Sequence, residues 1–306
     1  MDTGQGRPPR RFAILGPGGI GGLLAALLAR RGDEVICIAP PTTAAHLRDH
    51  GIELRSVRFG DFRVPVRAAT RLEAPVDVCF VAVKATMLED AIAEIPASAL
   101  GDGLVVPFLN GIDHVAWLRR RYPADQVVAG TIRIESARVA PGVIEQPSLF
   151  AAVELAPSDA NRSRVEALAA VLADLGMDVR LRDDELWMLW AKLAVLAPIA
   201  LLGTHENAPM GVVRERRRDD FVAVAREIAE AAMAADGVEL DPSATLRMLS
   251  GAGPDMRSSM QRDAEAGRPL ELDAIGGAIL RAAARGGVQV PVTERLVSDL
   301  RARVVS

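Results

Sequence analysis

Apolar residues in the first half of the chain come in short runs, separated by polar and glycine-containing segments. Runs of this length, bounded by turn residues, are typical of buried β-strands. Helical patterns alternate with the early runs, and this alternation predicts a mostly parallel sheet. The expected strands are residues 12–15, 35–39, 62–66, 76–83, 104–109, 127–134 and 149–155.

The pattern changes along the second half of the chain. Residues 132–146, with Pro141-Gly142 at the centre, predict a hairpin on the sheet, and a helix (161–175) and a short strand (178–181) follow. Beyond residue 183 only helical patterns occur, at 184–203, 211–236, 242–250, 255–266, 271–285 and 292–304. We therefore expect an α/β domain over residues 11–182 and an all-helical domain over 183–306, after a disordered tail at 1–10.

A glycine-rich turn separates the first expected strand from the first expected helix. Its glycines have the spacing G-x-G-x-x-G, at Gly16, Gly18 and Gly21. In this context the first glycine permits a tight turn, the second lets a pyrophosphate approach, and the third lets helix and strand pack closely. The helix N-terminus adds free amides and positive potential. The alternative is a flavodoxin-like turn without a nucleotide. The predicted cofactor-binding residues here are Gly16, Pro17, Gly18, Gly19, Ile20 and Gly21.

Composition and charge narrow the class of protein. The net charge of −4 over 306 residues disfavours a nucleic-acid binder, which needs a basic face. The two cysteines, Cys37 and Cys79, form no disulfide framework or metal-binding spacing, so we expect a reducing cytoplasm and no metal. Residues 186–203 are almost wholly apolar, but they contain Lys192 and Pro198, and acidic residues precede them. We interpret this segment as a buried core helix rather than a membrane span.

The chain contains only two lysines, Lys84 and Lys192, whereas 34 residues are arginines. A desolvated lysine can release its proton near neutral pH, whereas arginine stays protonated. Lys84 follows an expected strand, at the sheet edge where ligands of open α/β folds bind. Lys192 lies inside the apolar helix, where a charge is costly without a partner or a function. The alternative for either lysine is a snorkelling or ion-paired side chain.

Two further groups of polar residues are candidates for chemistry. Asn110 and Gly111 end an expected strand, where they form either a simple turn or an amide that faces the ligand. Ser258, Ser259 and Glu271 flank the break between two expected helices. By themselves these three residues are most simply explained as helix hydroxyls and a helix N-terminal carboxylate.

Taken together, these motifs resemble the ketopantoate reductase (2-dehydropantoate 2-reductase) family over nearly the whole chain. The resemblance rests on the glycine turn and on Val83-Lys84, Leu109-Asn110-Gly111, Trp190-Ala191-Lys192, Ser258-Ser259-Met260 and Glu271-Leu272-Asp273. It implies that Lys192 is the general acid and that Glu271 and Ser259, with Ser258, hold the substrate. It also implies that Asn110 and Lys84 lie between cofactor and substrate, and that the reaction belongs to pantothenate biosynthesis.

The sequence departs from the family pattern at the substrate side of the catalytic helix. Members usually carry asparagines four and eight residues after the lysine, on the same helix face. Here these predicted substrate-binding positions are Leu196 and Ala200. Either the substrate is more apolar than ketopantoate, or it is an imine, or a residue such as His205, Glu206 or Asn207 replaces the lost amides.

The second departure concerns the cofactor. NAD enzymes commonly carry an acidic residue at the end of the second strand, and no acid stands among residues 39–43. The family's arginine near Pro40 is absent too, which leaves Thr42, Thr43 or Arg48 to meet a 2′-phosphate. We expect NADPH.

The leading hypothesis is an NADPH-dependent reductase of a small 2-oxo acid, without nucleic-acid or membrane partners; the sequence leaves a homodimer open. A related reductase of a more apolar 2-oxo acid or an imine in secondary metabolism fits Lys192, Leu196 and Ala200 equally well. A dinucleotide sensor without turnover is the alternative from another class.

Overall fold

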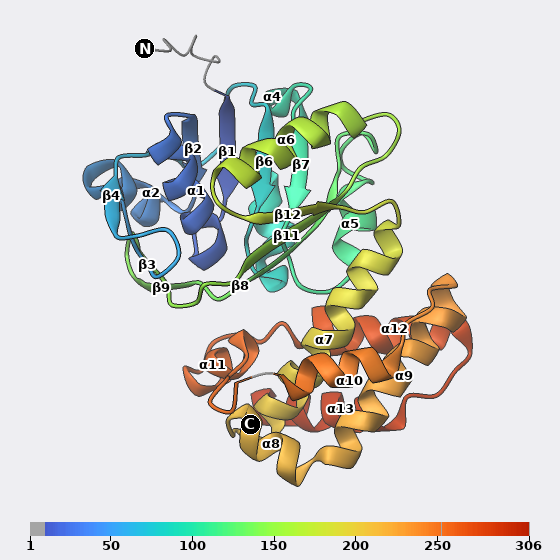
Figure 1. The fold of residues 1–306 in the computed structure, drawn as a ribbon. Helices are drawn as coiled ribbons and strands as arrows, with labels where there is room; N and C mark the ends of the chain where they lie inside the picture. Colours follow the sequence, from blue (N-terminus) through green and yellow to red (C-terminus); the bar gives the residue numbers. More distant parts are fainter. Residues whose placement is uncertain (1–9, 252, 306) are drawn as a thin grey trace, which may run out of the picture. The chain divides into compact units, whose positions relative to one another are not determined.

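The computed structural model describes residues 10–251 and 253–305, so most of the expected tail at 1–10 lies outside the described residues. Contacts divide the chain into two compact units (Figure 1). Unit 1 comprises the described residues up to Leu109 and Val115–Asp183, and unit 2 comprises Asn110–His114 and the residues from Asp184 onward. The short segment Asn110–His114, expected within the first domain, thus packs with the helices of unit 2.

Unit 1 is built on a five-stranded parallel sheet with the order β5-β2-β1-β6-β7. β1 lies at its centre, where Ala13 pairs with Ile36 on one side and with Cys79 on the other. Every residue of β6 and β7 is buried, as expected for strands that are covered on both faces. The predicted parallel sheet is therefore confirmed. Its strands are β1 (Arg11–Leu15), β2 (Glu34–Ile38), β5 (Arg67–Ala69), β6 (Val78–Val81) and β7 (Leu104–Pro107).

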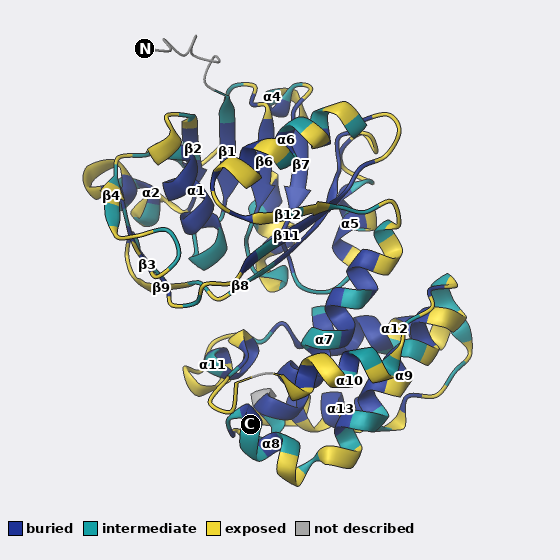
Figure 2. Cartoon of the chain, in the orientation of Figure 1, coloured by how far each residue is buried: buried dark blue, intermediate teal, exposed yellow. Residues whose placement is uncertain are grey.

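The helices of unit 1 follow the strands. Helix α1 is buried along its middle, from Gly21 to Leu28 (Figure 2), and it ends at Gly32, whose φ of 95° is left-handed and suits glycine. The helices are α1 (Gly19–Arg31), α2 (Pro41–His50), α3 (Leu88–Ala91), α4 (Ala97–Leu100) and α6 (Arg162–Asp174), with short 3-10 turns η1 (Ala85–Met87) and η2 (Ile92–Glu94). Helix α5 (Asp113–Leu118) begins in the segment that belongs to unit 2 and continues into unit 1.

Two smaller sheets complete unit 1, and they correct one prediction. The hairpin of β9 (Ala137–Ala140) and β10 (Val143–Gln146) forms, with Gly142 at φ 68°, but it does not join the parallel sheet. Instead β10 pairs with β3 (Ile52–Ser56), which continues to β4 (Phe62–Val64). The prediction missed β3, although Ile52 and Leu54 alternate with charged residues. The third sheet contains β8 (Ala129–Ile134), β11 (Ala151–Ala156) and β12 (Asp178–Leu181).

Among the described residues of unit 2, the regular secondary structure is helical. The helices are α7 (Glu185–Glu206), α8 (Met210–Arg216), α9 (Arg218–Asp236), α10 (Pro242–Ser250), α11 (Ser259–Glu265), the π-helix η3 (Asp273–Gly277), α12 (Ala278–Gly286) and α13 (Pro291–Val305). The helix expected over 211–236 is two helices that break at Arg217, and the helix expected over 271–285 begins with a π-helical turn.

The long helix α7 forms the core of unit 2. Asp184 caps it by accepting a hydrogen bond from the backbone N–H of Trp187 at 2.8 Å, as the acidic residues before it predicted. By length and composition α7 is apolar enough to cross a membrane, but 72% of its apolar window is buried inside the protein (Figure 2). Burial by α9, α11 and α13 explains its apolar character, so we interpret it as a core helix.

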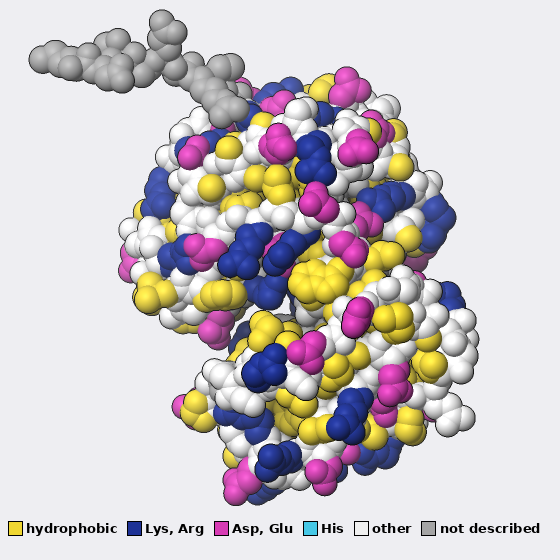
Figure 3. Space-filling view, turned by 45° about the vertical axis from the view of Figure 1, so that its right-hand side comes forward, with side chains coloured by type: hydrophobic (Ala, Val, Ile, Leu, Met, Phe, Trp, Pro, Cys, Tyr) yellow, Lys and Arg dark blue, Asp and Glu magenta, His cyan; other side chains and the backbone are white. Residues whose placement is uncertain are grey.

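Charged residues on the surface are mixed in sign. On the face that Figure 3 shows, basic and acidic side chains are interspersed, in line with the net charge of −4. Cys37 and Cys79 are buried, and burial raises the pKa of each thiol to about 12, so neither thiol is reactive near neutral pH.

Candidate active site

The glycine turn of unit 1 is sterically determined by the elements around it. Gly16 has a φ of 84°, and a Cβ there would lie 2.5 Å from Cγ1 of Val83, in the segment that follows β6. A Cβ on Gly21 would lie 2.2 Å from the carbonyl oxygen of Gly16. These two glycines therefore bring α1 and the turn into close contact, as the sequence predicted.

Gly18 is different, because its missing side chain leaves open space. No atom of the described residues lies within 4 Å of the place that a Cβ on Gly18 would take. Gly18 is the N-cap of α1, and no described side chain caps that helix end. Unsatisfied first-turn amides next to open space suit a pyrophosphate, so the turn fits the diphosphate of a dinucleotide.

The other predicted cofactor residues lie at the same carboxyl edge of the sheet. Lys84, half-buried, follows β6 and is the N-cap of η1. Thr42 and Thr43 lie in the first turn of α2, which follows β2; Thr42 is exposed and Thr43 half-buried. Arg48, by contrast, donates to the carbonyl oxygen of Ala68 at 3.2 Å. The two threonines are therefore better placed than Arg48 to meet a 2′-phosphate at the helix N-terminus.

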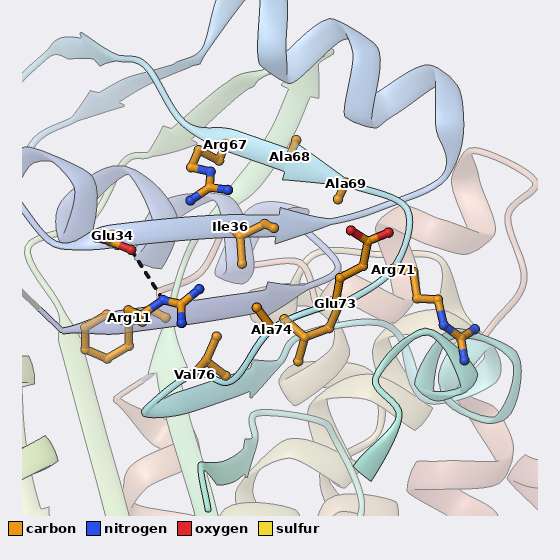
Figure 4. A pocket seen from close by; sticks show the side chains of 12 residues that line it. Arg11, Glu34, Ile36, Arg67, Ala68, Ala69, Arg71, Glu73, Ala74 and Val76 are labelled. Atoms are coloured by element: carbon orange, nitrogen blue, oxygen red, sulfur yellow. Dashed lines mark ion pairs between the residues drawn. The ribbon is translucent and has the colours of Figure 1, made fainter. Parts of the chain in front are cut away.

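A hollow in unit 1 lies at the opposite edge of the sheet (Figure 4). Arg11, Glu34 and Arg67, which line it, are the first residues of β1, β2 and β5, so the hollow lies at the amino ends of these strands. Ligands of open α/β sheets bind at the carboxyl ends. In this hollow Arg11 already pairs with Glu34 at 3.3 Å, and we assign it no part in the site.

Unit 2 joins two predicted site residues from distant parts of the sequence. Nδ2 of Asn110 donates a hydrogen bond to Oε2 of Glu271 at 2.9 Å, and Glu271 is buried. Gly111, at φ 86°, explains how this approach is possible: a Cβ there would lie 2.3 Å from the carbonyl oxygen of Ala274 in η3. The Asn-Gly turn therefore packs directly on the π-helix, and π-helical turns often occur at functional sites.

A second contact holds the Asn110–His114 segment to the helices. Asp113 accepts a hydrogen bond from Nη2 of Arg281 in α12 at 2.7 Å, and the same guanidinium donates to Asp273 at 3.0 Å. This exposed network joins the two segments that also carry Asn110 and Glu271.

Lys192 lies midway along α7 and is only 9% exposed. It is close enough to His114 for its charge to act on the ring: burial, first, and the charge of Lys192, second, lower the pKa of His114 to about 3. His114 is itself buried, and the sequence analysis missed it. Nothing in the local sequence distinguishes it from the other three histidines.

The remaining predicted residues have local roles or apolar surroundings. Oγ of Ser258 caps α11 by accepting from the backbone N–H of Gln261 at 3.0 Å, whereas Ser259 is exposed. Leu196 is half-buried, and Ala200 is fully buried in the apolar core of unit 2.

His205 is within 3.1 Å of Asp299, and Glu206 accepts from Nε of Arg217 at 2.8 Å, so both side chains are engaged at the end of α7. Within the described residues, no group of three His, Cys, Asp or Glu could hold a metal ion.

A parallel sheet with a dinucleotide turn, followed by helices that bury a lysine and an amide–carboxylate pair, defines an NAD(P)-dependent oxidoreductase. The chain belongs to the ketopantoate reductase family: residues 12–159 match the family "Ketopantoate reductase PanE/ApbA", and residues 185–304 match its C-terminal counterpart.

Individual relatives agree with this assignment. The chain is 30% identical to a 2-dehydropantoate 2-reductase of Caulobacter vibrioides over 95% of this chain and 98% of that protein. A PanE/ApbA-family ketopantoate reductase structure from Ralstonia eutropha has a TM-score of 0.84 at 26% identity, covering 95% of this chain and 97% of the other. A D-mandelate dehydrogenase structure with NADH and anilino(oxo)acetate shares the fold, with a TM-score of 0.89 at 22% identity over 96% and 98% of the two chains.

Proposed function

We propose that this protein is an NADPH-dependent reductase that converts a small 2-oxo acid into the 2-hydroxy acid, with Lys192 as the general acid. The observation that carries the proposal lies in unit 2. It is a buried lysine in the same unit as a hydrogen-bonded amide–carboxylate pair, at the three positions where the family resemblance expects them.

The reaction needs a hydride at the 2-oxo carbon and a proton at its oxygen. A bound reduced nicotinamide supplies the hydride. As negative charge develops on the carbonyl oxygen, the Lys192 ammonium stabilises it and then transfers its proton, which completes the alcohol. The balance is one 2-oxo acid, one NADPH and one proton to one 2-hydroxy acid and NADP⁺.

Asn110 and Glu271 position the substrate in this proposal. Each carboxylate oxygen of Glu271 has more than one lone pair, so Oε2 can accept from Asn110 while the carboxylate also accepts from the 2-hydroxyl group that forms as the substrate is reduced. Half-buried Asn110 keeps its own amide oxygen as an acceptor. Ser259, exposed at the first turn of α11, remains a candidate for the substrate carboxylate because helix N-termini favour anions, although α11 is short.

We favour a substrate whose carbon chain is more apolar than that of ketopantoate. Leu196, one helical turn after Lys192, presents an aliphatic side chain, and the next position on this face, Ala200, is 0% exposed. Neither residue can donate or accept a side-chain hydrogen bond. A hydroxylated chain at this face would lose hydrogen bonds, whereas an alkyl or aryl chain would gain contacts.

The cofactor and location are part of the proposal. We propose NADPH rather than NADH because residues 39–43 carry no carboxylate for the ribose hydroxyls. We place the enzyme in the cytoplasm, since the absence of a disulfide framework suits a reducing compartment.

The test is a substrate screen with purified protein. NADPH oxidation is followed at 340 nm with ketopantoate, 2-oxoisovalerate, 2-oxo-4-methylpentanoate and benzoylformate, and with a cyclic imine as the alternative class. We expect turnover with 2-oxo acids, and a higher kcat/KM for the apolar ones than for ketopantoate. Tight NADPH binding without turnover of any of these compounds would contradict the proposal and favour the sensor.

A further inference from the structure

His114 is a buried polar side chain without a structural partner. The residue is 6% exposed, and neither Nδ1 nor Nε2 has a hydrogen-bond partner among the residues that the structure describes. Buried polar atoms are nearly always hydrogen-bonded, and each exception requires an explanation. Leaving a buried polar group unsatisfied is destabilising. Packing alone therefore does not account for a histidine at this position.

The surroundings of His114 are those of the candidate site. It lies four residues after Asn110, in the segment that packs with unit 2. The Asp113–Arg281 hydrogen bonds and the contact of Gly111 with η3 hold the residues just before His114 against the helices of unit 2. The charge of Lys192 acts on the ring from α7. His114 is thus near the proposed proton donor, in the short segment that also carries Asn110.

The protonation state of His114 limits what the ring can do. With its pKa lowered to about 3, the imidazole is neutral at any working pH and carries one N–H and one lone-pair nitrogen. A neutral ring cannot supply the proton of the reaction. It can, however, accept a hydrogen bond from an ammonium through its lone pair.

We propose that His114 is a positioning residue for Lys192: its lone-pair nitrogen accepts one N–H of the ammonium during the reaction and directs another toward the substrate oxygen. This inference rests on the proposed function, because it requires Lys192 to be the proton donor. The ammonium sits on a flexible four-carbon chain and can take many orientations. A fixed acceptor therefore raises the fraction of lysine conformers that point an N–H toward the substrate oxygen. On this proposal, the buried ring destabilises the protein because its hydrogen-bond partner, the Lys192 ammonium, takes the required orientation only when substrate and cofactor are bound.

The test compares variants that separate the polarity of the ring from its volume. His114→Phe keeps a ring but removes both nitrogens. His114→Asn and His114→Gln restore a side-chain acceptor near the positions of Nδ1 and Nε2, respectively. The matched control is Thr204→Val in α7, because Oγ1 of Thr204 is also buried and unpartnered. Thr204 lies twelve residues after Lys192, or about 18 Å along the helix.

We expect activity and stability to change in opposite directions. His114→Phe should lower kcat at least tenfold, with KM changed less than threefold, while Tm stays equal or rises. One of the two amide variants should recover much of kcat despite a lower Tm, because the acceptor returns and packing worsens. Thr204→Val should leave kcat unchanged.

Two results would overturn the inference. If His114→Phe keeps full kcat, the ring has no positioning role. If all three His114 variants lose kcat in proportion to their loss of Tm, its role is structural. Both results presuppose a wild-type protein that reduces a 2-oxo acid and a Lys192→Ala variant that does not, so failure of the proposed function is recognised separately.

Discussion

Asn110 donates a hydrogen bond to Glu271 over 2.9 Å, joining two residues that are 161 positions apart in the sequence. The contact depends on Gly111, since any side chain there would collide with the backbone of the π-helix. The geometry of this one pair therefore depends on a strand end, a glycine and a π-helical turn together.

Replacing Asn110 tests this pair. Asn110→Ala removes a hydrogen bond to a charged group, worth about 1.5–3 kcal/mol, so kcat/KM should fall roughly 10- to 150-fold. Asn110→Asp places a second carboxylate against Glu271, which raises the pKa of one of the two groups. Its kcat/KM relative to wild type should therefore recover as pH falls from 8 toward 5. Measuring kcat/KM of Asn110→Asp and wild type from pH 8 to pH 5 tests this. A ratio of the two values that does not change with pH would contradict the proposed role of the Asn110–Glu271 pair.

Lys192 should be essential for turnover and dispensable for cofactor binding. Lys192→Ala should lower kcat by roughly 100- to 10,000-fold, as for other positioned acids. Lys192→Arg should not restore activity, because guanidinium keeps its proton. Calorimetry should give both variants the wild-type affinity for NADPH, since the glycine turn belongs to unit 1. A Lys192→Ala protein that keeps most of its turnover would remove the mechanism.

The glycines of the turn offer a matched pair of substitutions. Gly18→Leu fills open space, so it should abolish NADPH binding in calorimetry with little change in Tm. Gly21→Ala forces a Cβ to 2.2 Å from a backbone oxygen, so it should lower Tm as well as affinity. Full NADPH affinity in Gly18→Leu would show that the pyrophosphate lies elsewhere.

Cofactor preference follows from the end of β2. We expect the Kd for NADPH to be lower than the Kd for NADH when both are measured at one ionic strength, because Thr42 and Thr43 stand where NAD enzymes commonly carry an acid. Replacing both threonines with alanine should reduce the difference between the Kd values for NADPH and NADH. Tighter binding of NADH by the wild type would refute this expectation.

His114 should make the stability of the protein depend on pH. The unfolded chain binds a proton at this histidine below about pH 6.5, whereas the folded protein does so only near pH 3. The free energy of unfolding therefore falls as pH drops through this window, by about 1.4 kcal/mol per unit. His114→Phe lacks this contribution, so between pH 7.5 and pH 5 its stability relative to wild type should rise by about 2 kcal/mol. Urea unfolding at the two pH values measures the change; parallel behaviour would mean that the ring titrates normally.

Local features of the fold were predictable because they depend on neighbouring residues. The strand, glycine turn and helix around Gly16–Gly21 follow from steric rules that act within a few residues, and the structure contains all three. The burial of Lys192 was predictable as well, because a helix that is apolar on every side must lie inside a core.

Strand pairing and helix irregularities were harder to predict. The β9–β10 hairpin was recognised from Pro141-Gly142, yet its sheet was wrong, because the partner strand β3 lies some ninety residues earlier. The π-helix after Glu271 also escaped prediction. Its wider turn accompanies the packing of Gly111 on Ala274, a contact that has no trace in either local sequence.

The sequence by itself determined the two kinds of fold, the dinucleotide turn and the candidate Lys192, since these follow from periodicity, glycine sterics and residue chemistry close to each position, while Asn110 and Glu271 became candidates through the family resemblance. Only the tertiary structure decided that Asn110 bonds Glu271, that Ser258 caps a helix, and that His114 lies unpartnered near Lys192. These relations arise when the chain folds back on itself, because burial and hydrogen bonding depend on neighbours in space that the order of residues does not specify.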